Sequence, residues 1–421
     1  MASSTVRVLA AATLSALAAT ACGTGGETER RVLTVMMADD WYNVDAVTQA
    51  VQDFEADHPD VRVSMRGLPF GNIEEAIVND LAGPREVDVA QFHAFAAAAR
   101  GYAVDITDRF ETTFPDGTFV PGAVEDVTWK DRIYGVPLDV NALVLLVNRT
   151  ALESLGFTVD DLATFEGVME VAEATRARSD LKFTAIASSS WASYGWIRAN
   201  GGEVIEIGAD EVAVTLDTPE VVEALDFLQQ LTAGSDDDSL AFKPLYNDLS
   251  VDGFAVFRDG QTVLYPTGTW DAATLAANPP EWEWTTVPLP SGPRGDTPGA
   301  TTLGGSSLYI PEGADDVDLA FEFMVHLTSP QYTLRYAKEQ GRLPPQVAVL
   351  EDPFFDDPVY ATVVDVLPHA SAMRLIASPS ATDVFSNALA EILNDRVGAD
   401  EMMAEAQVEA SRGAATDLAS G

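Results

Sequence analysis

Two spacings of apolar residues alternate along the first part of the chain. The β-rich run 32–37 precedes the segment 45–57, whose apolar residues recur at helical intervals. Alternation over 61–65 predicts a second strand, 73–81 a second helix and 87–90 a third strand. Strand–helix–strand order is typical of a parallel sheet with crossover helices, so the sequence predicts an α/β protein.

The middle and the end of the chain are predicted to be more helical. Thr218 and Pro219 open a strong helix, because threonine favours the cap position and proline the first helical position. A strand-like run follows at 261–265. The other expected helices cover 150–155, 164–177, 191–199, 318–327, 330–338 and 385–395.

The length of the chain indicates more than one domain. It has 421 residues, of which 47% are hydrophobic, and single cores stop growing at about 250–300 residues. The mixture of helices and strands suggests two lobes. Only one cysteine is present, so no disulfide can form within the chain and the fold must rest on its core.

The composition is strongly acidic. The net charge is −42, from 66 acidic and 24 basic residues. Such a field repels nucleic acid and anionic membranes, so neither is expected as a partner. It also disfavours an anionic ligand, unless local arginines outweigh it. Only four of the basic residues are lysines, which indicates either adaptation to saline surroundings or a compositional bias.

The first 21 residues have the pattern of a signal peptide. Arg7 is followed by a run of apolar and small residues, 8–21, that is too short to span a bilayer comfortably. Residues 1–21 are therefore expected to be removed from the mature protein.

The lone cysteine directly follows this run. The segment 19–22 (ATAC) resembles a bacterial lipobox, in which the cysteine becomes lipidated and N-terminal, although Ala19 stands where the family usually has leucine. We expect a lipidated Cys22 within a polar tether, 22–31. The alternative is ordinary signal cleavage after Ala21, which would leave Cys22 free.

Six segments, in this order, carry a family pattern over nearly the whole mature chain. They are 54–63 (FEADHPDVRV), 88–107, 133–157, 215–231, 254–271 (FAVFRDGQTVLYPTGTWD) and 298–345. Together with the lipobox-like start, this ordered set resembles the bacterial extracellular solute-binding proteins of the sugar-binding, maltose-binding-like family, which serve ABC transporters.

The resemblance implies a fold of two α/β lobes with a ligand cleft between them. This is the type II periplasmic-binding-protein-like fold, whose lobes close on the ligand about a hinge. Lobe 1 would comprise residues 32–138 and 288–309, and lobe 2 residues 139–287 and 310–421.

The same resemblance directs attention to aromatic and polar residues at the cleft. A sugar has an apolar C–H face and a rim of hydroxyls, so aromatic rings and Asp, Asn or Arg side chains suit it. Trp270 is the strongest candidate, because a tryptophan at its position stacks on sugar in relatives. The full set of expected ligand-binding residues is Asp40, Trp41, Phe92, His93, Asp139, Asn141, Trp191, Tyr194, Trp270, Asp271, Gly304, Gly305 and Arg342.

Several of these residues have an equally simple structural role. A histidine is more often a satisfied structural group than a ligand contact, and an arginine in an acidic chain can pair with surface carboxylates. The structural alternatives are a capped loop for Asp40 and Trp41, core packing for Trp191 and Tyr194, a turn for Asn141 and for Gly304 and Gly305, and surface pairing for Arg342.

No motif for catalysis, a cofactor or a metal is found in the sequence. The four histidines, at 58, 93, 326 and 369, lack metal-ligand spacing. Paired carboxylates are unavoidable in so acidic a chain and are no evidence for glycosidase chemistry. We therefore expect a protein that is not an enzyme and holds no cofactor and no metal.

The function implied by the resemblance is reversible capture of a mono- or oligosaccharide. The protein would be a monomer held by its lipid on the extracellular face of the cell membrane, delivering the sugar to the permease subunits of an ABC importer. A polyol, a glycerophosphate or a peptide would also be compatible with the fold. Two functions of other classes stay open, namely an anchored glycan-active enzyme and a scaffold with an empty cleft.

Overall fold

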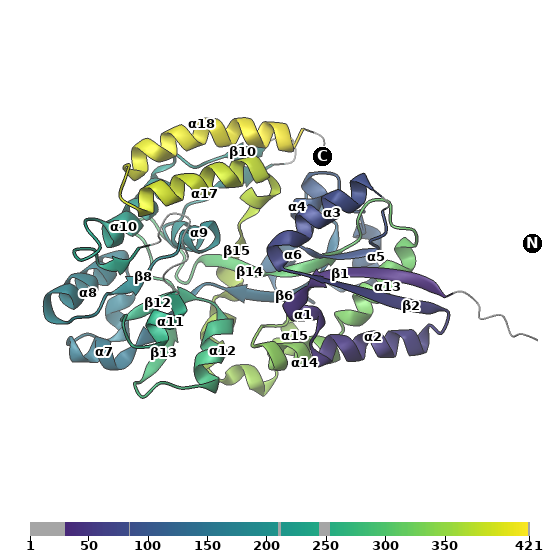
Figure 1. The fold of residues 1–421 in the computed structure, drawn as a ribbon, viewed down its shortest axis with the longest axis horizontal. Helices are drawn as coiled ribbons and strands as arrows, with labels where there is room; N and C mark the ends of the chain where they lie inside the picture. Colours follow the sequence, from purple (N-terminus) through teal and green to yellow (C-terminus); the bar gives the residue numbers. More distant parts are fainter. Residues whose placement is uncertain (1–29, 84, 209–211, 244–252, 420–421) are drawn as a thin grey trace, which may run out of the picture.

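A computed structural model describes residues 30–83, 85–208, 212–243 and 253–419 (Figure 1). The expected signal peptide, Cys22 and the tether up to residue 29 lie outside the described residues. Two groups of helices stand side by side, and strands β6 and β14 run between them (Figure 1).

The first group surrounds a mixed sheet, which we call the lobe 1 sheet. Its strand order is β15-β14-β3-β1-β2, with β6 also paired to β14. Strand β1 is parallel to both β2 and β3, which confirms the predicted strand–helix–strand order. The strands are β1 (Arg31–Ala38), β2 (Val61–Leu68), β3 (Val89–Phe92), β6 (Gly135–Ala142), β14 (Thr301–Tyr309) and β15 (Ala370–Ala372).

Helix α2 (Asp45–Asp57) shows how sequence periodicity forms this lobe. Its buried residues, Ala46, Val47, Ala50 and Phe54, recur at helical spacing and face the core. The other elements around this sheet are α1 (Asp39–Tyr42), η1 (Phe70–Asn72), α3 (Ile73–Ala82), α4 (Ala94–Ala99), α5 (Thr107–Thr113), α6 (Pro121–Glu125), β4 (Thr128–Trp129) and β5 (Arg132–Ile133).

The second group, lobe 2, is built on a three-stranded antiparallel sheet of order β12-β7-β13. Helix α10 begins at Pro219 after Thr218, as predicted. The strands are β7 (Val144–Asn148), β8 (Thr184–Ala185), β9 (Ile205–Ile207), β10 (Val212–Val214), β11 (Ala241–Phe242), β12 (Leu264–Thr267) and β13 (Trp284–Val287). The helices are α7 (Arg149–Ser154), η2 (Val159–Leu162), α8 (Phe165–Arg178), α9 (Ser190–Ala199), α10 (Pro219–Thr232), α11 (Gly253–Arg258) and α12 (Thr269–Ala277).

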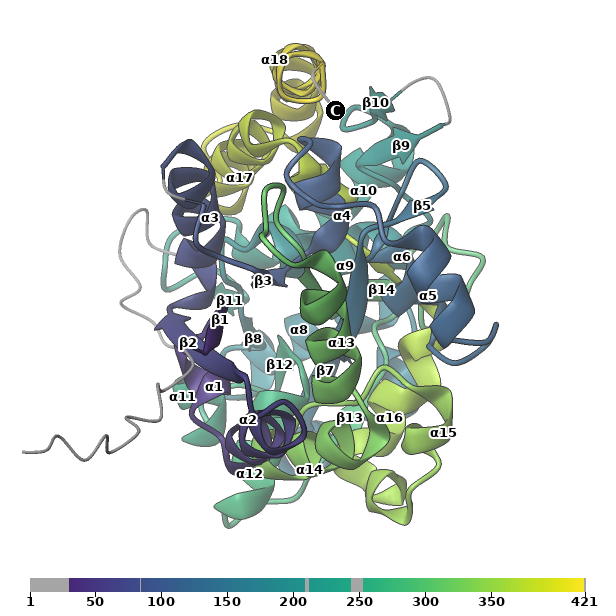
Figure 2. The ribbon, with the colours of Figure 1, turned by 90° about the vertical axis from the view of Figure 1, so that its right-hand side faces the viewer.

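The C-terminal third of the chain divides between the two groups. Helices α13 (Val317–Leu327) and α14 (Pro330–Gln340) pack against α2 (Figure 2). Helix α16 (Pro358–Val366) packs against β13 and α12, whereas α17 (Pro379–Leu393) and α18 (Ala399–Asp417) pack against α10. The short elements between them are α15 (Val347–Leu350), η3 (Pro353–Asp356), η4 (Leu367–His369) and η5 (Arg374–Ala377).

This packing disagrees with one part of the expected division into lobes. Residues 310–421 were all assigned to lobe 2, but α13 and α14 bury their apolar faces on the lobe 1 side, against α2. We therefore propose that residues 317–340 belong to lobe 1, as do residues 139–142 and 370–372, which pair within the lobe 1 sheet. The remaining lobe boundaries stay a prediction.

Two helices near the end of the chain differ from the prediction. Helix α17 begins at Pro379 instead of Phe385, with Ser378 as its cap. Helix α18 was not predicted, because its buried face consists of Met403 and four alanines. Alanine is a weak apolar signal, so the periodicity of this helix is hard to recognise from the sequence.

Strands β6 and β14 carry the chain between the lobes. They pair antiparallel from Ala142 opposite Leu303 to Gly135 opposite Tyr309, with an irregularity between Ser306 and Ser307. Every residue of β6 is buried. After Leu143 the chain enters β7, which belongs to the other sheet. Because β6 and β14 belong to the lobe 1 sheet and are joined along the chain to β7 and β13 of lobe 2, we expect a hinge motion between the lobes to be absorbed where these strands meet lobe 2.

Gly305 makes this crossing possible. Its φ of +120° is a conformation that side chains rarely adopt, and a Cβ there would overlap the backbone oxygen of Asp139. We expect Gly305→Ala to lower the free energy of unfolding by about 2–4 kcal/mol, measured by urea denaturation. Gly71→Ala is the matched control, because no atom lies within 4 Å of its added Cβ. Equal stability of the two variants would contradict this role.

Candidate ligand-binding site

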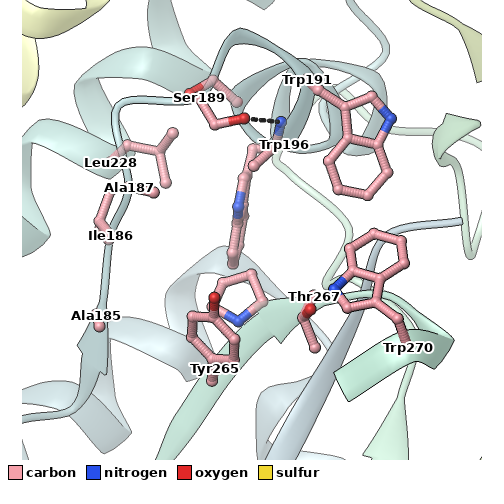
Figure 3. Close-up of a pocket in the computed structure, with 13 residues that line it drawn as sticks. Ala185, Ile186, Ala187, Ser189, Trp191, Trp196, Leu228, Tyr265, Thr267 and Trp270 are labelled. Carbon is pink, nitrogen blue, oxygen red and sulfur yellow. Dashed lines mark hydrogen bonds between the residues drawn. The ribbon is translucent and has the colours of Figure 1, made fainter. Parts of the chain in front are cut away.

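A cavity of about 200 Å³ opens on lobe 2 (Figure 3). It lies among the loop after β8, the first two turns of α9, helix α10 and the junction of β12 with α12. Its lining residues are Ala185, Ile186, Ala187, Ser189, Trp191, Ala192, Ser193, Trp196, Leu228, Tyr265, Pro266, Thr267 and Trp270. None of these is charged, so the cavity suits a neutral group.

Two tryptophans form one wall of this cavity. Trp191 lies in the first turn of α9, and Trp270 lies in the first turn of α12. Their ring centroids are 5.7 Å apart and their planes differ by 46° (Figure 3). Both side chains are half-buried, so ring surface is available to a ligand. Such a wall fits the C–H face of a sugar ring.

A few polar groups accompany the tryptophans. The Ser189 hydroxyl caps α9 by accepting a hydrogen bond from the backbone N–H of Ala192 at 3.3 Å. The Thr267 hydroxyl donates to Asp271 Oδ2 at 2.6 Å. Asp271 therefore orients Thr267, which lines the cavity. The side chain of Asp271 is itself half-buried beside the cavity.

Trp41 and Arg342 come together on lobe 1. The guanidinium of Arg342 lies over the Trp41 ring, 4.1 Å from its centroid, and Trp41 is only 3% exposed. One face of this indole is thus already occupied by a cation. The Trp41 Nε1 atom is buried and lacks a hydrogen-bond acceptor among the described residues. Trp41 is therefore enclosed by the protein in this structure, with an unpaired buried N–H, and its predicted contact with a ligand stays a prediction.

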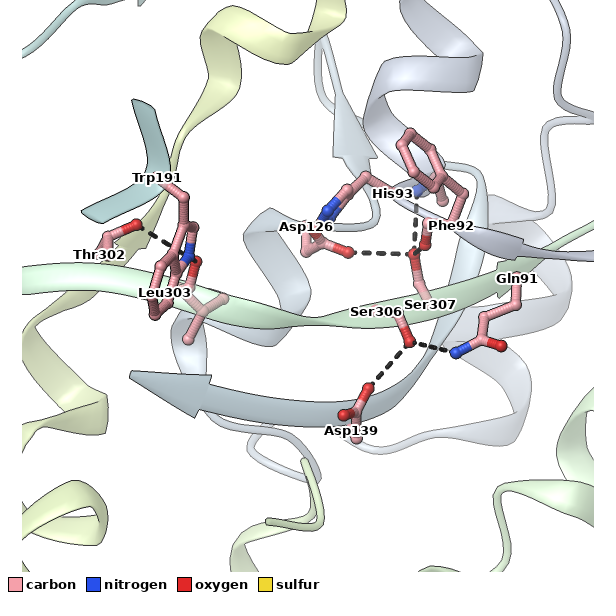
Figure 4. Close-up of polar contacts among 11 residues, drawn as sticks. Gln91, Phe92, His93, Asp126, Asp139, Trp191, Thr302, Leu303, Ser306 and Ser307 are labelled. Carbon is pink, nitrogen blue, oxygen red and sulfur yellow. Dashed lines mark hydrogen bonds and ion pairs between the residues drawn. The ribbon is translucent and has the colours of Figure 1, made fainter. Parts of the chain in front are cut away.

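Asp139 is buried behind this pair, within a chain of hydrogen bonds (Figure 4). Arg342 Nη1 donates to Asp139 Oδ2 at 3.3 Å, and the Ser306 hydroxyl donates to Asp139 Oδ1 at 2.8 Å. Gln91 Nε2 donates to Ser306 at 3.0 Å, and the Gln91 carbonyl accepts from the N–H of Ala38 at 2.9 Å. Burial raises the pKa of Asp139, and Arg342 and Ser306 oppose that rise.

His93 forms a second buried pair nearby. Its Nδ1 lies 2.7 Å from Asp126 Oδ1, and Asp126 Oδ2 lies 3.0 Å from the Ser307 hydroxyl (Figure 4). Burial lowers the pKa of His93, but the charge and hydrogen bond of Asp126, with the charge of Asp139, together raise it above 6.5. Phe92 is half-buried with its ring 5.0 Å from that of His93.

Two predicted ligand residues are fully used by the protein itself. Asn141 is 0% exposed; its Nδ2 donates to the Thr269 hydroxyl at 2.9 Å, and its Oδ1 accepts from the N–H of Thr269 at 3.2 Å. Tyr194 is also 0% exposed and donates to Glu203 at 2.9 Å, away from the cavity. In this structure both side chains form hydrogen bonds within the protein. Their contact with a ligand stays a prediction.

The remaining candidates lie in β14 or in α1. Gly304 lies against the Trp191 ring, since a Cβ there would be 3.1 Å from Cζ2. Gly305 contacts the backbone of β6 at Asp139. Asp40 lies in α1, and its side chain is outside what the structure describes. The structure thus gathers two clusters, Trp191–Trp270 on lobe 2 and Trp41–Arg342–Asp139 on lobe 1.

Several residues of these clusters were missed from the sequence. Gln91 and Ser306 connect the lobe 1 strands, Asp126 pairs with His93, and Tyr265 and Thr267 line the cavity. Gln91 in a buried strand was a usable signal, because a buried amide must find partners. Nothing in the local sequence of Asp126 indicates its role.

No metal site is formed by the described residues. Within them, no three His, Cys, Asp or Glu side chains come together in a way that could hold an ion. In the same part of the chain, every helix is too short or too polar to cross a membrane.

Comparison with known proteins identifies the family. A model described as bacterial extracellular solute-binding protein matches residues 49–362. The chain belongs to this family. The family consists of extracellular binding proteins, not of enzymes.

Individual relatives agree with this assignment. The lactose-binding protein of Rhizobium radiobacter is 23% identical over 328 residues, covering 75% of this chain and 74% of that protein. The sugar-binding protein MalE from Xanthomonas citri has a similar structure, with a TM-score of 0.77, 18% identity and coverage of 91% of this chain and 98% of that one. Maltose-bound MalE3 of T. maritima gives a TM-score of 0.73, 22% identity and coverages of 90% and 98%. The predicted type II periplasmic-binding-protein-like fold is confirmed.

The His93–Asp126 pair predicts how this solute-binding protein responds to pH. Because the folded state raises the pKa of His93 above 6.5, the pair stabilises the fold fully below pH 6.5 and loses that effect as pH rises through the raised value. We expect the stability difference between wild type and His93→Asn to be larger at about pH 6 than at about pH 9, by urea denaturation. Exposed His369→Asn is the control. A difference that does not change with pH would refute the raised pKa.

Proposed function

We propose that this protein reversibly captures a neutral sugar and delivers it to the permease of an ABC importer. The observation that carries the proposal is the wall formed by Trp191 and Trp270 on an uncharged cavity of about 200 Å³. Cavities for drug-sized ligands measure about 300–1,000 Å³, so this one is sized for one sugar ring, or for one end of an oligosaccharide.

The two lobes would contact different parts of such a ligand. The tryptophans of lobe 2 would cover the apolar ring face, while the half-buried Arg342 guanidinium on lobe 1 would supply donors for hydroxyls. Closure of the cleft would exclude water and strengthen these polar contacts. The names of relatives support this reading, since one is a lactose-binding protein and another was solved with maltose bound.

A neutral ligand is favoured over a phosphorylated one. The lining of the cavity holds no charged side chain, and Arg342 is already paired with Asp139. His93 is likewise paired with Asp126, so Arg342 and His93, the two cationic candidates on lobe 1, are each matched by an acid. A glycerophosphate is therefore the contrasting ligand for a test.

A thermal-shift screen of the soluble chain, begun after Cys22, tests the proposal with lactose, maltose, longer maltodextrins and glycerol 3-phosphate. A ligand that binds only the folded state raises the melting temperature by mass action. We expect a rise with one sugar class and none with glycerol 3-phosphate. Low and high salt should both be used, because a net charge of −42 destabilises the compact state unless it is screened. A rise with glycerol 3-phosphate alone would refute a neutral ligand.

Trp270→Ala should then weaken binding of the identified sugar by about 1–3 kcal/mol, because the variant removes one of the two stacking rings. Isothermal titration calorimetry measures the change. The matched control is Trp284→Ala, since Trp284 is a half-buried tryptophan of β13 that does not line the cavity. Unchanged affinity in Trp270→Ala would remove the central residue of the proposed site.

We further propose that the protein is a monomer anchored by a lipid on Cys22 at the extracellular face of the cell membrane. The support is the signal-peptide pattern of residues 1–21 and the single cysteine that follows it. Cys22→Ser should move the protein from the membrane fraction to the soluble fraction, because the cysteine that would carry the lipid is then lost. Fractionation and immunoblotting measure this, with Ser3→Ala as a control. Continued tethering of Cys22→Ser would rule out the lipid.

A further inference from the structure

Trp191 has two different partners. One face of its ring lines the lobe 2 cavity beside Trp270 (Figure 3). Its Nε1 points the other way and donates to the backbone oxygen of Leu303, in β14, at 2.9 Å (Figure 4). In the described part of the chain no hydrogen bond joins the Trp270 side chain to β14, so the two tryptophans of the wall differ in this respect.

Leu303, the residue that accepts this hydrogen bond, lies in the segment 303–305 of β14, which we call the pivot. Leu303 is followed by Gly304 and by Gly305, whose φ of +120° only glycine adopts without strain. The irregularity in the pairing with β6 follows directly, between Ser306 and Ser307. Because Gly304 also lies against the Trp191 ring, the indole contacts two consecutive residues of the pivot.

Helix α9 also packs against the two crossing strands at Gly195, one turn after Trp191. A Cβ at Gly195 would lie 2.6 Å from Leu143 Cδ2 and 3.3 Å from Thr302 Cγ2. Leu143 directly follows β6 and Thr302 is in the first half of β14, so α9 lies close against both crossing strands. The helix that supplies a wall of the cavity therefore also supports the hinge.

We propose that Trp191 is a positioning residue that couples the cavity to the hinge. Its N–H fixes β14 at Leu303, so a sugar ring that holds the indole in place also sets the angle between the lobes. This inference rests on the proposed function for its ligand, but the coupling between Trp191 and the hinge exists without ligand. A ligand shifts a conformational equilibrium only through contacts that differ between the states, and Trp191 supplies such a contact.

The test measures the distance between the lobes in the ligand-free protein. The full chain with Cys22→Ser holds no other cysteine, so one introduced pair can carry spin labels at exposed sites, Thr48→Cys on α2 and Glu166→Cys on α8. Pulsed electron paramagnetic resonance then gives the distribution of lobe arrangements. Trp191→Phe keeps an aromatic ring in the cavity and removes only the N–H and part of the ring area.

We expect Trp191→Phe to change the ratio of lobe arrangements by about fivefold, because the Leu303 carbonyl loses the nearer of its two side-chain donors. Trp270→Phe makes the same chemical change in the other wall residue and should keep the wild-type distribution. A wild-type distribution in folded Trp191→Phe would overturn the proposal. If Trp191→Phe does not fold, Gly304→Ala replaces it, since the added Cβ would press on Trp191 Cζ2 at 3.1 Å. An unchanged distribution of lobe arrangements in Gly304→Ala would also overturn the proposal.

A second arm adds maltose, or the sugar that the thermal-shift screen selects. At saturation Trp270→Phe should reach the wild-type closed distance despite weaker binding, whereas Trp191→Phe should not. Full closure in Trp191→Phe would overturn the coupling. If no sugar binds the wild type, the proposed function fails, while the ligand-free comparison of the two tryptophan variants still decides the role of Trp191.

Discussion

The antiparallel pairing of β6 with β14 is the interaction on which the two-lobe arrangement depends. Both strands belong to the lobe 1 sheet; β6 leads into β7 of the lobe 2 sheet, β14 follows β13 of that sheet, and all of β6 is buried. Buried backbone groups must be hydrogen-bonded, so the crossing cannot be a loose linker. An irregularity in this pairing lies next to Gly305, where the absence of a side chain allows a close approach to Asp139.

A buried polar network fixes the lobe 1 side of this crossing. Ala38, Gln91, Ser306, Asp139 and Arg342 are linked by successive hydrogen bonds that tie β1, β3, β14 and β6 to the segment after α14. Burying a carboxylate is costly unless its oxygens are paired, and here each Asp139 oxygen has a donor. The consequence for the site is that the Arg342 guanidinium of lobe 1 is held in place by Asp139, while lobe 2 presents tryptophan rings.

The acidic surface has little to do with holding the fold together. Surface ion pairs such as Arg294–Glu223, 2.8 Å apart and about two-fifths exposed, contribute little each in water. Stability must therefore come from the two apolar cores and from the buried network, since no disulfide is available. The net charge of −42 opposes compaction through mutual repulsion, which dissolved salt screens.

Local periodicity was enough to determine many single elements from the sequence. Helix α2 was predicted with its observed bounds, and the start of α10 followed from Thr218 and Pro219, because caps and helical spacing are properties of neighbouring residues. The ordered resemblance determined the fold class. The alanine-lined face of α18 was missed for the opposite reason, since alanine gives almost no periodic signal.

Only the tertiary structure decided which aromatic and polar residues share a site. Trp191 and Trp270 are far apart in sequence and meet because α9 and α12 both begin at the cavity, whereas Tyr194, one helical turn from Trp191, points inward to Glu203. Asn141 looked available in the sequence, but the start of α12 uses both of its polar atoms. Such outcomes depend on how β6 and β14 bring distant helices together, and no local pattern of residues contains that information.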